Sequence, residues 1–270
     1  MSIEENEGLS KEQINEFCNS GAEIFGSVAG ASIGFLLAGP FGGLVGAAAT
    51  SPLTSLLKKL GSEVSNQIMA PREKIRIGAT YHRAALIIEN RLLSGEKPRD
   101  DGFFDIKKDD RSSASTILEG ILQKAKEEHE EKKLPYYSAF LANITFDESI
   151  DSQKALTFIK IIDRLSYQQL CILSYIKSLG QITFENWNQF FQNNADAQVY
   201  FDFYFEIAEL FEMNLLKQFN GKQLGGFHNG KLTLFGLELY NLMALNQIPA
   251  ADTNPIKIKI DSIGTLIKEN

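Results

Sequence analysis

The sequence predicts a mainly α-helical protein with four successive parts and one small β-hairpin near its carboxyl end. A stretch of 34 residues without charge lies near the amino terminus, capping residues precede several segments with helical apolar spacing, and an Asn-Gly pair separates two short runs late in the chain. The predicted parts are an acidic leader 1–23, an apolar segment 24–57, a helical domain 58–150, and a domain 151–270 that contains the hairpin.

The leader contains six acidic residues and one basic residue, and Ser10 is a candidate N-cap for a short helix. The apolar segment follows this acidic leader and has no basic region before it. We therefore expect no cleaved signal peptide.

Glycines recur at four-residue spacing through segment 24–57, which lies between Glu23 and Lys58. A helix needs about 20 residues to cross a bilayer core of about 30 Å, so the segment is long enough to span one. Four-residue spacing aligns glycines on one helix face, where a second helix backbone can approach closely. The segment thus predicts a glycine zipper of membrane helices, packed through Gly26, Gly30, Gly34, Gly39, Gly43 and Gly46.

Pro40 divides this segment into halves that would each extend only about 25 Å as helices. One kinked, tilted crossing and a hairpin of two short helices both remain open. A third alternative is a soluble protein whose Gly/Ala run packs inside an oligomer core. A flexible linker fits less well, because Ile, Phe, Val and Leu separate the glycines.

The formal net charge of −7 argues against general nucleic-acid binding, but the charge is unevenly distributed. Residues 58–99 contain 9 bases and 4 acids, directly after the apolar segment. This position fits the positive-inside bias and predicts an inner-membrane protein with most of its chain in the cytoplasm. The two cysteines, Cys18 and Cys171, suggest no disulfide framework and fit a reducing compartment.

Helix is expected to continue over Lys58–Met69, and Pro71 suits the first position of a basic helix, Arg72–Leu93. Its arginines fit either a face in contact with solvent or lipid headgroups, or a pocket for an anionic ligand. Ser94–Ser113 is polar and turn-rich, which predicts a loop or linker at or near a domain division. A helix is then predicted from Ser113 to Pro135, followed by a second apolar segment; His129 is expected to be a surface residue.

Ser166 and Gln169 form a capping box before a helix with Leu170, Leu173, Ile176 and Leu179 on one face. Thr183 is expected to open a short helix. The apolar segment 199–219 predicts a buried helix, and Asn229-Gly230 predicts a tight hairpin turn. We expect a final helix over Phe235–Leu245, with Leu239, Leu242 and Met243 inward, and an edge strand over Ile256–Ile260.

This order of helices and hairpin is that of a winged helix, and KLTLFGLELYNLM resembles the passage from wing to helix in that superfamily. The expected recognition helix holds Asp202, Glu206, Glu209 and Glu212 against a single Lys217. Phosphate contact needs the opposite charge. We therefore expect no duplex DNA partner and favour a protein-interaction or sensing role.

Catalytic motifs such as GxxxxGK[ST], HExxH, CxxC and GxSxG do not occur, and the three histidines are scattered. The sequence therefore predicts a protein that is not an enzyme, with no metal and no cofactor. Two functions remain: a membrane effector whose glycine-rich segment opens a pore or disrupts the bilayer, and a soluble winged-helix regulator or adaptor.

A glycine-rich membrane segment joined to cytoplasmic helices and a winged-helix-like carboxyl half resembles the channel effector of the Hailong anti-phage defence system. The resemblance implies a homotetrameric ion channel that causes abortive infection. It also implies that a partner nucleotidyltransferase makes a single-stranded DNA oligomer that holds the channel shut. On this resemblance the ligand-binding residues would be Arg72, Arg76, Arg83 and Arg91, with Tyr81 as a base-stacking platform.

Overall fold

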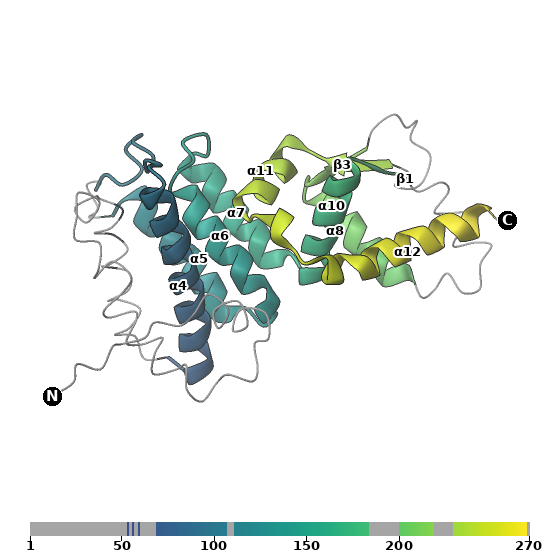
Figure 1. Cartoon of the computed structure of the whole chain (residues 1–270), viewed down its shortest axis with the longest axis horizontal. Helices are drawn as coiled ribbons and strands as arrows, with labels where there is room; N and C mark the ends of the chain where they lie inside the picture. Colours follow the sequence, from purple (N-terminus) through teal and green to yellow (C-terminus); the bar gives the residue numbers. More distant parts are fainter. Residues whose placement is uncertain are drawn as a thin grey trace. The chain divides into compact units, whose positions relative to one another are not determined.

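The computed structural model describes residues 53, 56 and 59, and the ranges 69–106, 111–183, 200–218 and 229–268. These residues are mainly helical, with a small antiparallel sheet (Figure 1). The chain divides into two compact units, Met1–Asp163 and Arg164–Asn270. The predicted division after residue 150 and the loop proposed as a linker both precede this boundary.

The first unit contains four described α-helices and one 3₁₀ turn, η3. They are α4 (Pro71–Leu93), α5 (Ser113–Glu127), η3 (Glu131–Lys133), α6 (Leu134–Ile144) and α7 (Ser152–Arg164). Helix α4 packs on both α5 and α6, and the core includes Tyr137, Phe140 and Phe158. The rings of Phe140 on α6 and Phe158 on α7 meet edge to face, which explains why α7 belongs to this unit.

Helix α4 begins where the sequence predicts, with Pro71 in its first turn. Proline is favoured there because its missing N–H would have no helical acceptor. The Glu73 carboxylate accepts a hydrogen bond from the Ala70 N–H, at 2.9 Å. Of the predicted extension Lys58–Met69, the structure describes only Lys59, which is helical, and Met69, which is not.

The predicted helix from Ser113 to Pro135 is wrong in its second half. Helix α5 ends at Glu127, and the backbone of Glu128 is extended. Pro135 lies in the first turn of α6, so it starts a helix instead of ending one. His129 lies in the intervening turn and is exposed, which confirms its expected surface position.

The second unit contains four described α-helices, one 3₁₀ turn and three short strands. In order they are α8 (Tyr167–Leu179), β1 (Ile182–Thr183), α10 (Phe201–Glu212), β2 (Leu216–Lys217), β3 (Asn229–Leu232), α11 (Leu234–Leu242), η5 (Leu245–Gln247) and α12 (Ala250–Lys268). The sheet order is β1-β3-β2, and both pairs are antiparallel. Thr183 therefore ends a strand; the short helix predicted after it lies outside the described residues.

The capping box at the start of α8 is confirmed. The Ser166 hydroxyl accepts from the Gln169 N–H and the Gln169 side chain accepts from the Ser166 N–H, both at 3.0 Å. Leu170, Leu173 and Ile176 are buried as predicted, but Leu179 in the last turn is 50% exposed.

The tight turn predicted at Asn229-Gly230 is wrong. Both residues belong to β3, where Gly230 pairs with Ile182 and Asn229 pairs with Thr183. An Asn-Gly pair favours a turn locally, but here pairing with a strand from earlier in the chain takes precedence. Helix α11 follows β3, with Leu239, Leu242 and Met243 buried as predicted.

The edge strand predicted over Ile256–Ile260 is also wrong, because this stretch lies inside helix α12. Ile256 is 3% exposed while Ile258 is 64% exposed, as expected of residues two apart on a helix. Helix α12 packs on α8, and the Tyr167 hydroxyl donates to the Asp252 carboxylate at 3.0 Å. These contacts explain why helix replaces the strand that local alternation favours.

Candidate functional site

The glycines predicted to pack membrane helices all lie outside the described residues, as does nearly all of segment 24–57. Among the residues that the structure describes, no helix combines the length and apolarity needed to cross a bilayer. Within the described residues, the candidate site consists of the basic helix α4 and the carboxylates near it.

The middle of α4 is enclosed on all sides, since every residue from 75 to 82 is buried. Tyr81 is 3% exposed, and burial raises the pKa of its hydroxyl. Its ring therefore lies in the core and is not presented to solvent as a stacking platform. Burial also lowers the pKa of the neighbouring His82 to about 4, so this imidazole is neutral at pH 7.

Arg72 and Arg76 both contact Glu131, in the turn between α5 and α6. Their Nε atoms lie 2.9 and 3.4 Å from the same Glu131 oxygen, and Arg76 Nη1 also donates to the Lys126 carbonyl at 3.3 Å. The Arg72 side chain is 61% exposed, whereas that of Arg76 is 11% exposed. Arg76 thus holds the α5–α6 turn, and only Arg72 of the two is well exposed.

The four candidate arginines do not form one cluster. Helical spacing places Arg72, Arg76 and Arg83 on one side of α4, and Arg83 is half-buried. Arg91 lies in the last turn, where Nη2 approaches the Glu96 carboxylate at 2.6 Å and Nη1 donates to Asn143 at 2.9 Å. Its guanidinium also lies 4.0 Å from the centroid of the Phe146 ring. Arg91 thus fixes the loop after α4.

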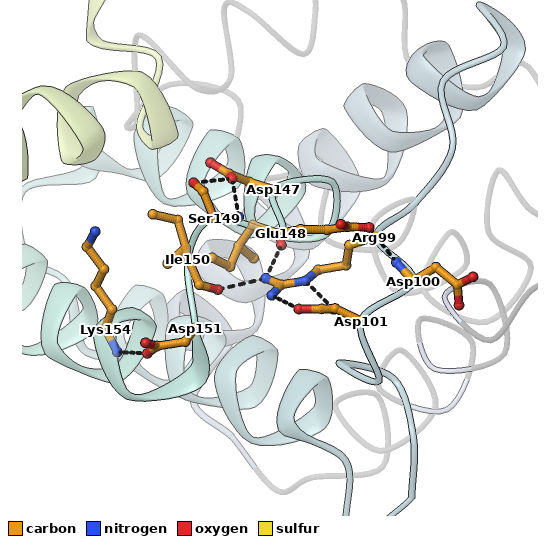
Figure 2. Close-up of polar contacts among 10 residues, drawn as sticks. Arg99, Asp100, Asp101, Asp147, Glu148, Ser149, Ile150, Asp151 and Lys154 are labelled. Atoms are coloured by element: carbon orange, nitrogen blue, oxygen red, sulfur yellow. Dashed lines mark hydrogen bonds and ion pairs between the residues drawn. The ribbon is translucent and has the colours of Figure 1, made fainter.

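The sequence did not predict a buried arginine in the polar loop after α4. Arg99 is 4% exposed and lies between the loop and the α6–α7 connection (Figure 2). It makes two hydrogen bonds to Asp101 and donates to the carbonyls of Ile144 and Ile150, at 3.3 and 2.9 Å. Its hydrogen bond lowers the pKa of Asp101. This predicted linker is therefore anchored within the first unit.

A second buried charge network stabilises the α5–α6 turn. Lys133, 2% exposed, places Nζ at 2.5 Å from a Glu128 oxygen, and the Tyr137 hydroxyl donates to that oxygen at 2.8 Å. Burial alone would raise the pKa of Glu128, but the hydrogen bonds from Lys133, from the Glu130 N–H and from Tyr137 hold it below its usual value. The EEHEEKK stretch is thus a structural turn and not an acidic helix face.

In the second unit, two carboxylates of α10 stabilise the start of α8. Glu206 accepts from the Ser166 hydroxyl at 2.9 Å, and Glu209 accepts from the Gln169 side chain at 2.8 Å. Asp202, Glu209 and Glu212 are exposed on α10, which contains neither Lys nor Arg. The acidic character predicted for this helix is therefore present at its surface.

The described residues include no group of three or more His, Cys, Asp or Glu side chains arranged to hold a metal ion. The described residues form internal ion pairs in the first unit, and helix α10 of the second unit has an acidic, partly aromatic surface. Comparison of the chain with protein-family models, curated proteins and solved structures found no match.

Proposed function

We propose that this chain is a membrane effector that oligomerises through segment 24–57 and forms an ion channel, with its two helical units in the cytoplasm. The observation that supports this most directly is the uncharged run between Glu23 and Lys58, with glycines four residues apart. The excess of bases in residues 58–99 supports the cytoplasmic side for the rest of the chain.

The membrane proposal is tested with the full-length chain in bacteria. Wild-type protein should remain in the membrane pellet after high-salt washing and should arrest growth when overexpressed. Gly30→Leu and Gly34→Leu should abolish growth arrest and leave the protein in the pellet, because bulky side chains separate the packed helices. Val28→Leu, an apolar change between the glycines, is the matched control and should remain toxic.

The resemblance to the Hailong effector supports a homotetramer, a role in abortive infection, and a single-stranded DNA oligomer as the ligand that keeps the channel shut. The binding face that we propose is the side of α4 with Arg72 and Arg83. Arg76 and Arg91 hold turns and loops of the first unit, so they are poor positions for a binding test.

Ligand binding is tested with Arg72→Gln and Arg83→Gln in one chain, measured by fluorescence anisotropy on a labelled single-stranded oligonucleotide. We expect affinity to fall about tenfold or more and its salt dependence to weaken. Lys160→Gln on α7, also an exposed cation of the first unit, is the control and should bind as wild type does. Equal affinity of all three proteins would remove α4 as the binding face.

We propose a winged-helix fold for the second unit, supported by the order α8, β1, α10, β2, β3, α11 and by the sheet order β1-β3-β2. The acidic surface of α10 supports a protein-interaction role over duplex DNA binding. This topology also favours the alternative function, a soluble regulator or adaptor whose Gly/Ala run packs in an oligomer core. Full recovery of the chain in a high-speed supernatant without detergent would favour that alternative.

A further inference from the structure

One side of helix α10 carries three neighbouring aromatic side chains, of which Phe205 is exposed while Phe201 and Tyr204 are half-buried. The segment was predicted to be buried on almost all sides, but burial is confined to the face with Phe203, Ile207 and Leu210. Phe205 is 58% exposed. Its ring centroid lies 6.2 Å from that of Phe201 and 5.9 Å from that of Tyr204, so the three rings form one patch.

Helical spacing determines what surrounds this patch. Phe201, Phe205 and Glu212 fall on one stripe, because residues four and eleven positions apart return to the same side of a helix. Asp202 and Glu209 lie along one flank of that stripe, and both are exposed. On the opposite, buried side of α10, Lys259 Nζ lies 5.3 Å from the ring of Phe203.

This combination indicates the chemistry of what binds there. Exposed aromatic side chains are typical anchors of protein interfaces, and clustered rings attract cations through their faces. Carboxylates beside them attract the same charge and repel a phosphate backbone. A surface with rings in the centre and acids at the edge is complementary to a helix with apolar side chains on one stripe and Lys or Arg beside it.

We infer that the outer face of α10 is a docking surface for a cationic amphipathic helix of a partner protein. Phe205 is its central anchor, and the exposed Asp202 and Glu212 select the positive charge, while Glu209 also accepts from the Gln169 side chain of α8. This inference rests on the interaction role proposed for the second unit and adds the surface and the kind of partner. It does not depend on membrane insertion.

The test uses the purified full-length chain and a labelled synthetic peptide of about five helical turns, with Leu on one stripe and Lys on both flanks. A second peptide replaces each Lys by Glu. Variants Phe205→Ser and Glu212→Lys alter the α10 surface. Ile258→Ser and Asp261→Lys on α12 are matched controls, since they change an equally exposed apolar side chain and an exposed acid elsewhere in the same unit.

We expect the Lys peptide to bind wild type and the two α12 controls equally. Phe205→Ser should weaken binding about tenfold or more, Glu212→Lys severalfold, and the Glu peptide should not bind. Equal binding of the two peptides, or equal losses in the α10 and α12 variants, would overturn the inference. Duplex DNA is the third probe: salt-sensitive binding that Glu212→Lys strengthens would instead overturn the interaction role proposed for the unit.

Discussion

Individual buried charges explain much of how the first unit is held together. Glu128 and Lys133 form an ion pair within the α5–α6 turn. Arg99, in the loop after α4, donates hydrogen bonds to the carbonyls of Ile144 and Ile150 at the α6–α7 connection. Buried charges are tolerated only when they are paired and hydrogen-bonded, so removing one partner costs more than removing a neutral group.

Glu128→Gln should lower the free energy of unfolding by roughly 3–5 kcal/mol, because it leaves the Lys133 ammonium buried without a counter-charge. Urea denaturation followed by circular dichroism measures the loss. Tyr137→Phe removes only one hydrogen bond to the same carboxylate and should cost about 1 kcal/mol. Similar losses in the two variants would show that the ion pair is not the main contribution.

His82 predicts a pH dependence in the acid range. Its pKa is about 4 in the folded chain against 6.5 without burial, so folding favours the neutral imidazole. The contribution of His82 to the free energy of unfolding is fully present above pH 6.5. It is lost as the pH falls from 6.5 towards 4, by at most about 1.4 kcal/mol per pH unit. Unfolding curves at several pH values should show a shallower loss over this range for His82→Leu; an unchanged slope would contradict the assignment.

At the scale of elements, the sequence predicted helices best where residues within one turn determine the outcome. The Pro71 start of α4 and the Ser166–Gln169 capping box depend on neighbours along the chain, and both are confirmed. The turn at Asn229-Gly230 and the strand at Ile256–Ile260 failed because distant segments compete with the local preference. Strand β1 pairs with Asn229 and Gly230, and helix α8 packs on α12, which contains Ile256–Ile260.

Helix α11 provides a prediction about close packing between elements. A Cβ atom added at Gly236 would lie 2.2 Å from the carbonyl oxygen of Leu215, which forces the helix away from the residue before β2. Gly236→Ala should therefore destabilise the second unit by about 1–3 kcal/mol. The helical Gly120 is the matched control.

At Gly120 an added Cβ would lie 3.3 Å from the movable end of Ile159. Gly120→Ala should therefore stay within about 1 kcal/mol of wild type, since the gain in helix propensity offsets the tight contact. Chemical denaturation of both variants measures the difference. A larger loss for Gly120→Ala than for Gly236→Ala would contradict the described packing.

At the scale of the whole molecule, the two compact units predict two unfolding transitions. Each unit has its own buried core, with Phe140 and Phe158 in the first and Phe203 and Leu239 in the second. In calorimetry, Glu128→Gln should lower the midpoint of one transition and Gly236→Ala that of the other. If both variants shift one common transition, the units unfold as one cooperative body.

The candidate site shows where sequence reasoning reached its limit. The basic helix α4 was predicted with its start and its arginines, but Tyr81 is in the core and Arg76 is bonded to Glu131, a residue 55 positions away. Arg99 gave no sequence signal beyond a charged, turn-rich loop. The exposure of Phe205 was not predicted, because the apolar composition of a segment does not show which of its faces is buried.

The sequence by itself determined the helical class, the starts of α4, α5 and α8 and the acidic character of α10, since capping, helical spacing and charge depend on residues near one another in the chain. Tertiary structure alone decided which arginines are committed to internal partners, which strand β3 joins and which side of α10 remains exposed. These outcomes depend on desolvation and on contacts between distant segments, and the free energy of burying a side chain is set by what packs against it.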